Sequence, residues 1–125
     1  MGNNPHFDID VERGELGENL LKDILEGKVE VKTDYRAKET GNYYVEYKQY
    51  NSDYESWSGI SITEAKWWAW VCPTSNKVTI VPVETLRKIV KDNWGTFRHT
   101  RQPIHNNQTN ASMGILVPVA SIHQI

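Results

Sequence analysis

The chain has 125 residues and a formal net charge of -2, with 38% hydrophobic and 10% aromatic residues. This length suits a single domain, residues 1–125, and leaves no room for a second core. One cysteine excludes an internal disulfide, and no apolar run is long enough for a membrane span or a signal peptide. We therefore expect a soluble, intracellular protein of a reducing compartment such as the cytoplasm.

The two halves of the chain differ in charge. Residues 1–64 contain 14 Asp and Glu against 7 Lys and Arg, whereas residues 65–125 contain 2 against 7. This asymmetry suggests an acidic half that holds cations beside a basic half that holds phosphates. A solvated surface on which charges fall unevenly is an equal alternative.

A polar arm, residues 1–13, opens the chain and includes an alternating run from His6 to Val11. Leucines and an isoleucine at helical spacing then predict a helix over Glu15–Glu26, and Gly27 is a plausible stop. We expect one edge of this helix to face the sheet that follows.

Alternating apolar and polar residues predict two strands, Val29–Thr33 and Tyr43–Lys48, with a turn at Thr40-Gly41-Asn42 between them. We expect the strands to pair antiparallel with Asp34 opposite Glu46. This register places Lys32 opposite Lys48 and gathers two carboxylates and two ammonium groups on one patch of sheet.

The rest of the chain predicts two helices, three strands and a long polar loop. In order they are a short helix that Ser61 and Glu64 begin with a capping box, a strand over Ala65–Val71, a strand over Val78–Val81, a helix over Val83–Asp92, a polar loop over residues 93–113 and a closing strand over Ile115–Val119. Loops as long as 93–113 are usually functional or disordered.

Three stretches together resemble the PD-(D/E)XK nuclease superfamily. Asp34 with Glu46-Tyr47-Lys48 is similar to its active-site signature, and Gly14-Glu15-Leu16-Gly17-Glu18 resembles the first-helix start of Holliday junction resolvase-like members. Residues 58–71, SGISITEAKWWAWV, resemble the segment after the catalytic strand in small phage-type members. The likeness covers roughly residues 14–83. It departs from the family in having no separate strand before the Asp strand, which leaves the identity of the acidic ligand open.

The resemblance implies an α/β (α+β) fold with a restriction-endonuclease-like mixed β-sheet core of four or five strands, flanked by helices. It also implies a nuclease that uses Mg²⁺, with Mn²⁺ as an alternative, and acts most readily on DNA in replication, recombination or repair. A phage origin, action in the host-cell cytoplasm and a homodimer are consistent with it. A catalytically inactive nucleic-acid-binding module and an oligomer-forming structural protein are the alternatives.

Within the resemblance, Asp34 and Glu46 bind the metal and Glu18 is an outer helper. Lys48 orients or helps to deprotonate the attacking water, because its two-residue distance from Glu46 places both side chains on one face of a strand. Lys32 is a rival for this role through its expected cross-strand position. The alternative is a salt-bridge ladder across a hairpin.

Basic residues of the second half are candidates for contacts with a nucleic-acid backbone. They are Arg87, Lys88, Lys91, Arg98 and Arg101. A solvated helix face is the alternative. Trp57 and Trp94 have polar neighbours and are the better candidates for base stacking, whereas Trp67, Trp68 and Trp70 are expected in the core or in a dimer face.

Overall fold

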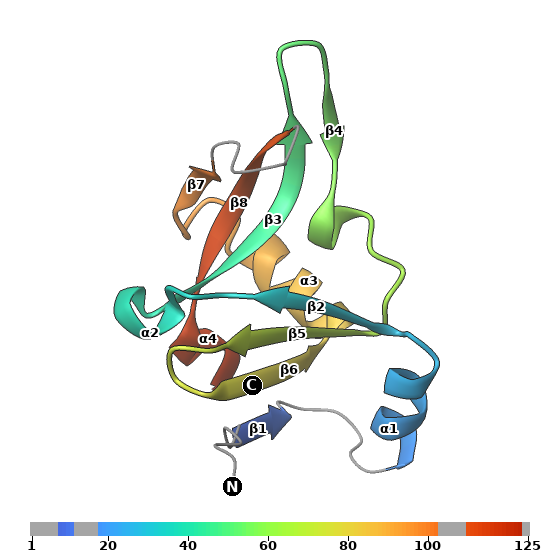
Figure 1. Ribbon diagram of the computed structural model, residues 1–125. Helices are drawn as coiled ribbons and strands as arrows, with labels where there is room; N and C mark the ends of the chain where they lie inside the picture. The colour runs from blue at the N-terminus through green and yellow to red at the C-terminus, as the bar shows by residue number, and fades with distance from the viewer. Residues whose placement is uncertain (1–7, 12–17, 103–109, 124–125) are drawn as a thin grey trace, which may run out of the picture.

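Two four-stranded β-sheets form the protein, as Figure 1 shows for a computed structural model that describes residues 8–11, 18–102 and 110–123. Sheet A contains, in spatial order, β1 (Asp8–Val11), β6 (Lys77–Pro82), β5 (Trp67–Cys72) and β2 (Val29–Thr33). Sheet B contains β4 (Glu55–Trp57), β3 (Asn42–Tyr50), β8 (Ala111–Pro118) and β7 (His99–Gln102). The protein is thus mixed α/β, with two sheets where one was expected.

Helices and one helical turn connect the strands. They are α1 (Glu18–Leu25), α2 (Ala37–Thr40), the 3-10 turn η1 (Gly59–Ser61), α3 (Val83–Asp92) and α4 (Val119–His123). Among these helices of the described residues, none has the length and apolar character that crossing a membrane requires.

The antiparallel hairpin expected between β2 and β3 is wrong. β2 runs parallel to β5, whereas β3 pairs antiparallel with β4 and β8 in the other sheet. The chain changes sheets through α2, which ends at Gly41 in the left-handed region, φ 75°. The expected turn residues Thr40 and Gly41 instead form the C-terminal end of α2, so they connect a helix to β3 rather than two strands of one hairpin.

The larger of two apolar clusters in the described residues lies between the sheets, and the smaller one joins Leu20 of α1 to Trp67, Ala69 and Ile80 of sheet A. The rings of Trp70 from β5 and Tyr43 from β3 stack with centroids 4.0 Å apart and an interplanar angle of 8°. Trp68, Val45 and Ile115 are fully buried in the same cluster. Of the two places expected for the tryptophans of β5, the core and a dimer face, the structure shows the core. β3 contributes buried residues to this core, whereas β2 lies at its edge.

Several predicted elements are confirmed closely. β2 and α3 begin and end at the expected residues, and β5 and β6 differ from expectation by one or two residues at each end. The helix expected over Glu15–Glu26 is confirmed from Glu18 to Leu25, although Leu20 is buried and Leu25 is 87% exposed. In the N-terminal arm, β1 pairs parallel with β6.

Two expectations for the loops are wrong. The short helix expected to start at Ser61 is instead η1, which ends there. The expected loop over residues 93–113 contains β7 and the first residues of β8, although 103–109 lie outside the described residues. β7 has the sequence HTRQ, and its pairing with β8 at one edge of sheet B needs no apolar alternation that a sequence pattern would reveal.

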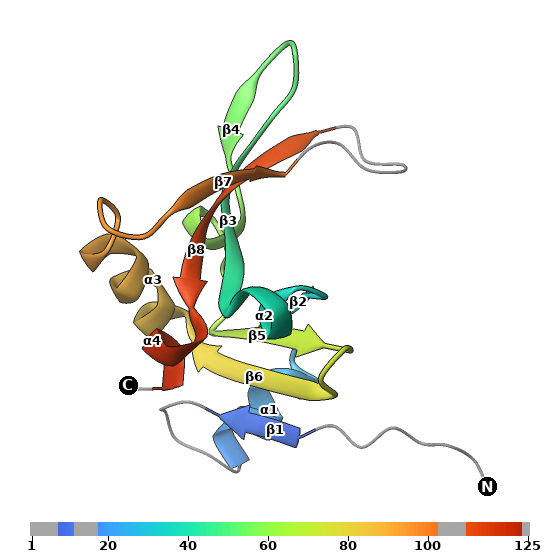
Figure 2. The same cartoon turned by 90° about the vertical axis from the view of Figure 1, so that its left-hand side faces the viewer.

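Sheet B extends beyond sheet A at one end. Figures 1 and 2, which are related by a 90° turn, both show β4 and the adjoining halves of β3, β7 and β8 projecting away from β2, β5 and β6. The start of β3 lies beside the core, because Tyr43 and Val45 are buried. The two ends of sheet B therefore have different surroundings.

Candidate functional site

Two charged side chains lie on one face of β2. The Lys32 Nζ is 3.5 Å from a carboxylate oxygen of Glu30, and the two side chains are 39% and 36% exposed. They share a face because alternate residues of a strand project in the same direction. Their partners in β5 are the fully buried Trp68 and Trp70, so this Glu30–Lys32 pair stands at the rim of the core.

Each member of the Glu30–Lys32 pair has a second contact. The Lys32 Nζ lies 5.6 Å from the centroid of the Trp68 ring, within the range of a cation–π interaction. The Thr63 hydroxyl donates a hydrogen bond of 3.3 Å to the Glu30 carboxylate. These contacts restrict both side chains while leaving each of them partly open to solvent.

An open pocket of about 520 Å³ adjoins the pair. Its lining comes from residues 27–30 at the start of β2, from Gly59 and from residues 62–65 before β5. Glu30 and Glu64 contribute carboxylates to this lining and Lys28 contributes an ammonium group. The pocket is therefore polar, accessible and next to a fixed carboxylate–lysine pair.

Gly59 joins this pocket to β3. Its φ is +53°, and a Cβ at this position would overlap the backbone carbonyl of Glu46 and lie 3.1 Å from the Glu46 Cβ. Only glycine fits such a close approach in the left-handed region. Glu30 and Glu46 thus flank the same segment, residues 59–65, from two different sheets.

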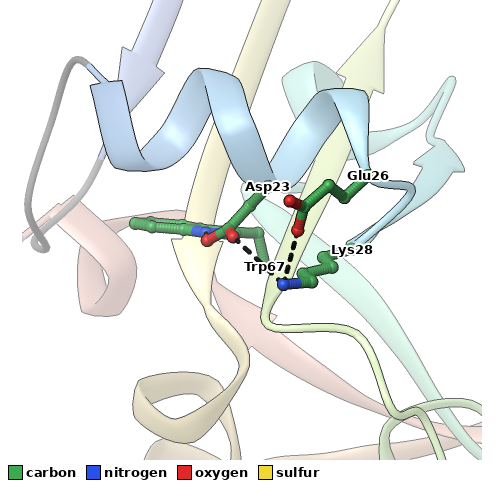
Figure 3. Close-up of polar contacts among 4 residues, drawn as sticks. All are labelled: Asp23, Glu26, Lys28 and Trp67. Carbon is green, nitrogen blue, oxygen red and sulfur yellow. Dashed lines mark hydrogen bonds and ion pairs between the residues drawn. The ribbon is translucent and has the colours of Figure 1, made fainter.

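Lys28 is held by one carboxylate of α1 and one that directly follows the helix. Its Nζ lies 2.6 Å from Glu26 and 3.8 Å from Asp23, and Figure 3 shows all three side chains with Trp67. The Trp67 indole N–H also donates to Asp23, over 2.8 Å. The hydrogen bond with Glu26 is the main cause that raises the pKa of Lys28. Lys28 therefore stays charged at the mouth of the pocket.

Asp34 connects β2 to β3 through backbone hydrogen bonds. Its Oδ1 accepts from the N–H groups of Arg36 and Ala37, each at 2.9 Å, and its Oδ2 accepts from the Tyr44 N–H at 3.3 Å. Three donors occupy most of the roughly four lone-pair directions of a carboxylate. Asp34 therefore stabilises the start of α2 and its junction with β3.

Glu46 and Lys48 project to opposite faces of sheet B, so the expectation that they share a face is wrong. A β-bulge shifts the register between them: Glu46 is opposite Gly114, whereas Lys48 is opposite Met113. Directly paired residues share a face, and consecutive residues of a strand do not. Lys48 instead forms an ion pair of 3.0 Å with Glu55.

Glu46 lies beside Tyr44 on the outer face of β3. Burial is the main cause that raises the pKa of Tyr44 to about 12; a hydrogen bond with Ser112 opposes the rise and the negative charge of Glu46 adds to it. Within the described residues, the Glu46 carboxylate forms no ion pair or hydrogen bond. It is the freer of the two expected metal ligands.

Glu18 is the first residue of α1, and its side chain lies outside the described residues. Lys32, expected opposite Lys48, is on a different sheet from it. Among the described side chains of the expected catalytic residues, Asp34, Glu46 and Lys48 form no hydrogen bond or ion pair with one another.

The expected basic residues have different surroundings. Arg87 donates to the carbonyls of Ile60 and Thr63, at 3.0 and 2.7 Å, and so fixes the segment between η1 and β5. Lys88 pairs with Asp92 at 2.7 Å. Lys91 and Arg98 are exposed, and Arg101 lies over the Tyr50 ring.

A preformed metal centre is not evident in the described part of the chain, where no three His, Cys, Asp or Glu side chains converge. The donor set suits a hard cation, because Glu30 and Glu46 offer carboxylate oxygens. Mg²⁺ is commonly held by only one or two carboxylates, with waters and substrate phosphate completing its coordination.

Glu30 is not among the residues that the sequence pattern singled out, although it belongs to a second Glu-x-Lys tripeptide. Residues 30–32 read Glu-Val-Lys, the same Glu-x-Lys spacing as residues 46–48. The resemblance to the nuclease superfamily matches the second tripeptide, whereas the first lies within β2, a strand that the sequence predicts from Val29 to Thr33. Comparison with protein-family models, curated proteins and solved structures gives no match to this chain.

Proposed function

We propose that this protein is a metal-dependent nuclease that hydrolyses phosphodiester bonds beside the Glu30–Lys32 pair. The observation that carries the proposal is the 3.5 Å contact between a carboxylate and an ammonium group on one strand face, next to an open polar pocket. Phosphodiester hydrolysis needs these two kinds of group, one to hold a cation and one to stabilise developing negative charge.

Each residue has a distinct part in the proposal. Lys32 supplies a fixed positive charge that orients the attacking water and stabilises the anionic phosphoryl oxygens in the transition state. Glu30 supplies the first carboxylate, and Glu46, across residues 59–65, supplies a second. A bound Mg²⁺ or Mn²⁺ would neutralise phosphate charge and lower the pKa of a coordinated water.

DNA is the proposed substrate, on the strength of the resemblance to the PD-(D/E)XK superfamily. A restriction-endonuclease-like core belongs to the same proposal, and its support is the mixed sheet β1-β6-β5-β2 with α1 and α3 connected to it. A phage source, a cytoplasmic location and a homodimer are further parts of the proposal that the resemblance alone supports.

The test is cleavage of linear, nicked, branched and single-stranded DNA with Mg²⁺, with Mn²⁺ and with EDTA. We expect cleavage that EDTA abolishes and that Glu30→Gln reduces by at least about a hundredfold, the lower end for a group positioned at the reacting atoms. Glu39→Gln, which removes an exposed carboxylate of α2, is the matched control and keeps full activity. Absence of metal-dependent cleavage of every substrate would contradict the proposal.

A further inference from the structure

A row of side chains crosses all four strands of sheet B. Trp57 of β4 is opposite Lys48 of β3, Lys48 is opposite Met113 of β8, and Met113 is opposite Arg101 of β7. Directly opposite residues of antiparallel strands share a face, so these four residues form one row, called here the sheet B row. The bulge at Tyr47 creates it, since an unbroken register would turn Lys48 to the other face.

The two outer members of the sheet B row are open to solvent, whereas Lys48 is 29% exposed and Met113 is partly buried against the core. The same face is fully buried nearer to sheet A. Ile115, two residues after Met113 in β8, is fully buried, whereas Trp57 is 62% exposed and Arg101 is exposed. Figures 1 and 2 show why, because this end of sheet B projects beyond sheet A. A tryptophan with so much accessible ring surface is available to a partner.

Two cations of this surface lie over aromatic rings. The Lys48 Nζ is 5.9 Å from the centroid of the Trp57 ring, and the Arg101 Cζ is 4.9 Å from the centroid of the Tyr50 ring. Each ring thus has a positive charge over one face. Nucleic-acid single strands are bound by this combination, in which bases stack on rings and phosphates contact the charges.

We propose that the sheet B row binds a single-stranded segment of nucleic acid, with a base stacked on Trp57 and phosphates at Lys48 and Arg101. Three strand spacings separate Trp57 from Arg101, roughly 14 Å, which is long enough for contact with several nucleotides. A duplex hides the faces of its bases, so an exposed ring favours an unpaired strand. This inference rests on the proposed function for the nature of the ligand and narrows the substrate to DNA with single-stranded character.

Glu55 is an acidic residue beside the sheet B row. Its replacement should strengthen the binding of a single strand, whereas the loss of Trp57, Lys48 or Arg101 should weaken it. Its carboxylate is 3.0 Å from the Lys48 Nζ and is 65% exposed. A phosphate at Lys48 competes with this carboxylate for the same ammonium group. Glu55→Gln should therefore strengthen binding of a single strand, by about two- to fivefold for an exposed ion pair.

Arg36 and Lys38, at the start of α2, provide a matched control, because both are exposed and distant in sequence and element from the sheet B row. Arg36→Ala with Lys38→Ala removes as much positive charge as Lys48→Ala with Arg101→Ala. If net charge alone governed binding, both pairs would have equal effects. The sheet B row instead requires that only the second pair weakens binding.

The experiment measures fluorescence anisotropy of a labelled oligothymidylate with the full chain in EDTA, where cleavage cannot occur. We expect Trp57→Ala to weaken binding by at least about fivefold, the lower end for one stacked base. The Lys48 and Arg101 pair of substitutions should reduce the salt slope by about 1.4, since each phosphate contact on a single strand contributes about 0.7. Thermal unfolding is measured for each variant and should change little at these exposed positions.

Intrinsic fluorescence is a second readout. Trp57 is the most exposed tryptophan, while Trp68 and Trp70 are fully buried, so oligothymidylate should quench emission in the wild type and not in Trp57→Ala. Unchanged affinity in Trp57→Ala, or tighter binding of a matched duplex than of the single strand, would overturn the inference. Binding of the single strand without metal-dependent cleavage would support the inference and overturn the proposed function.

Discussion

The chain contains two Glu-x-Lys tripeptides, residues 30–32 and 46–48, and their side chains are arranged differently in the two strands. In β2 the strand is regular, so Glu30 and Lys32 share a face and their charged groups are 3.5 Å apart. In β3 a bulge separates Glu46 from Lys48 and sends them to opposite faces. A two-residue spacing places side chains together only where the register is unbroken.

The two lysines consequently have different partners. Lys32 lies against a carboxylate and a buried tryptophan at the rim of the core. Lys48 lies against Glu55 and the exposed Trp57, at the end of sheet B that leaves the core. The first arrangement is suited to chemistry in a partly desolvated site, and the second to contact with a long, flexible ligand.

The largest expected difference between the two regions appears when Lys32 and Lys48 are each replaced by alanine. We expect Lys32→Ala to reduce the rate of DNA cleavage by a hundredfold or so, because the group that stabilises developing charge is lost. Lys48→Ala should lower affinity for the substrate and leave the rate at saturation within about threefold. Single-turnover kinetics at saturating DNA separates the two effects. The reverse result would return the catalytic lysine to β3, as the resemblance to the nuclease superfamily implies.

Local patterns were sufficient to predict much of the secondary structure. β2 is marked by alternation and α3 by helical periodicity, and both were located to the residue. These elements satisfy their own local preferences, so the rest of the chain does not alter them. The tryptophans of β5 were likewise recognisable as core, because a run of large apolar residues is seldom left exposed.

Strand pairing and the bulge could not be predicted in the same way. β2 pairs with β5, which lies more than 30 residues away in sequence. This pairing depends on the apolar surface of Trp68 and Trp70, which local patterns in β2 do not reveal. The bulge at Tyr47 depends on what faces it across the sheet, since its ring packs against Trp94 and its hydroxyl lies 2.8 Å from the ring of His99. Neither Trp94 nor His99 is near Tyr47 in sequence. The unbroken register expected for β3 was therefore wrong, and so was the expectation that Glu46 and Lys48 share a face.

Gly59→Ala should have a large effect on stability, because Gly59 joins the two regions. A side chain there must occupy the left-handed region at φ +53° and overlap the Glu46 carbonyl. We expect a loss of about 3 kcal/mol in the free energy of unfolding, at the upper end for strain at one residue. Urea denaturation measures it, and Gly95→Ala, where a Cβ would meet nothing within 4 Å, is the control. Equal stability of the two variants would show that residues 59–65 can move away from Glu46 with no loss in the free energy of unfolding.

Asp34→Ala tests whether this carboxylate is structural. It accepts hydrogen bonds from three backbone N–H groups at the junction of β2, α2 and β3, so we expect a loss of about 2 kcal/mol in the free energy of unfolding. Thermal or urea denaturation measures it, with Lys38→Ala on exposed α2 as the control. A variant as stable as the wild type but inactive in cleavage would instead identify Asp34 as a metal ligand.

The smallest expected effect concerns the outer face of β3 and appears only in alkaline solution. The pKa of Tyr44 is raised from about 10 to about 12, chiefly by burial. Its neutral form is therefore favoured in the folded state, and this contribution to stability is fully present below pH 10. Between pH 10 and 12 the unfolded state ionises first, so stability falls as the pH rises through this window.

Tyr44→Phe should remove this part of the pH dependence, and Glu46→Gln should reduce it slightly. Phenylalanine has no proton to lose, although the variant also forfeits the hydrogen bond with Ser112 and should be about 1 kcal/mol less stable at neutral pH. The Glu46 charge is one of the causes that raise the pKa of Tyr44, so its removal brings that pKa closer to 10. Urea denaturation at several pH values from 9 upward measures both variants against the wild type. If Glu46→Gln left the fall in stability above pH 10 unchanged, the Glu46 carboxylate would lie farther from Tyr44 than the structure shows. The position from which Glu46 is proposed to bind the metal would then be wrong.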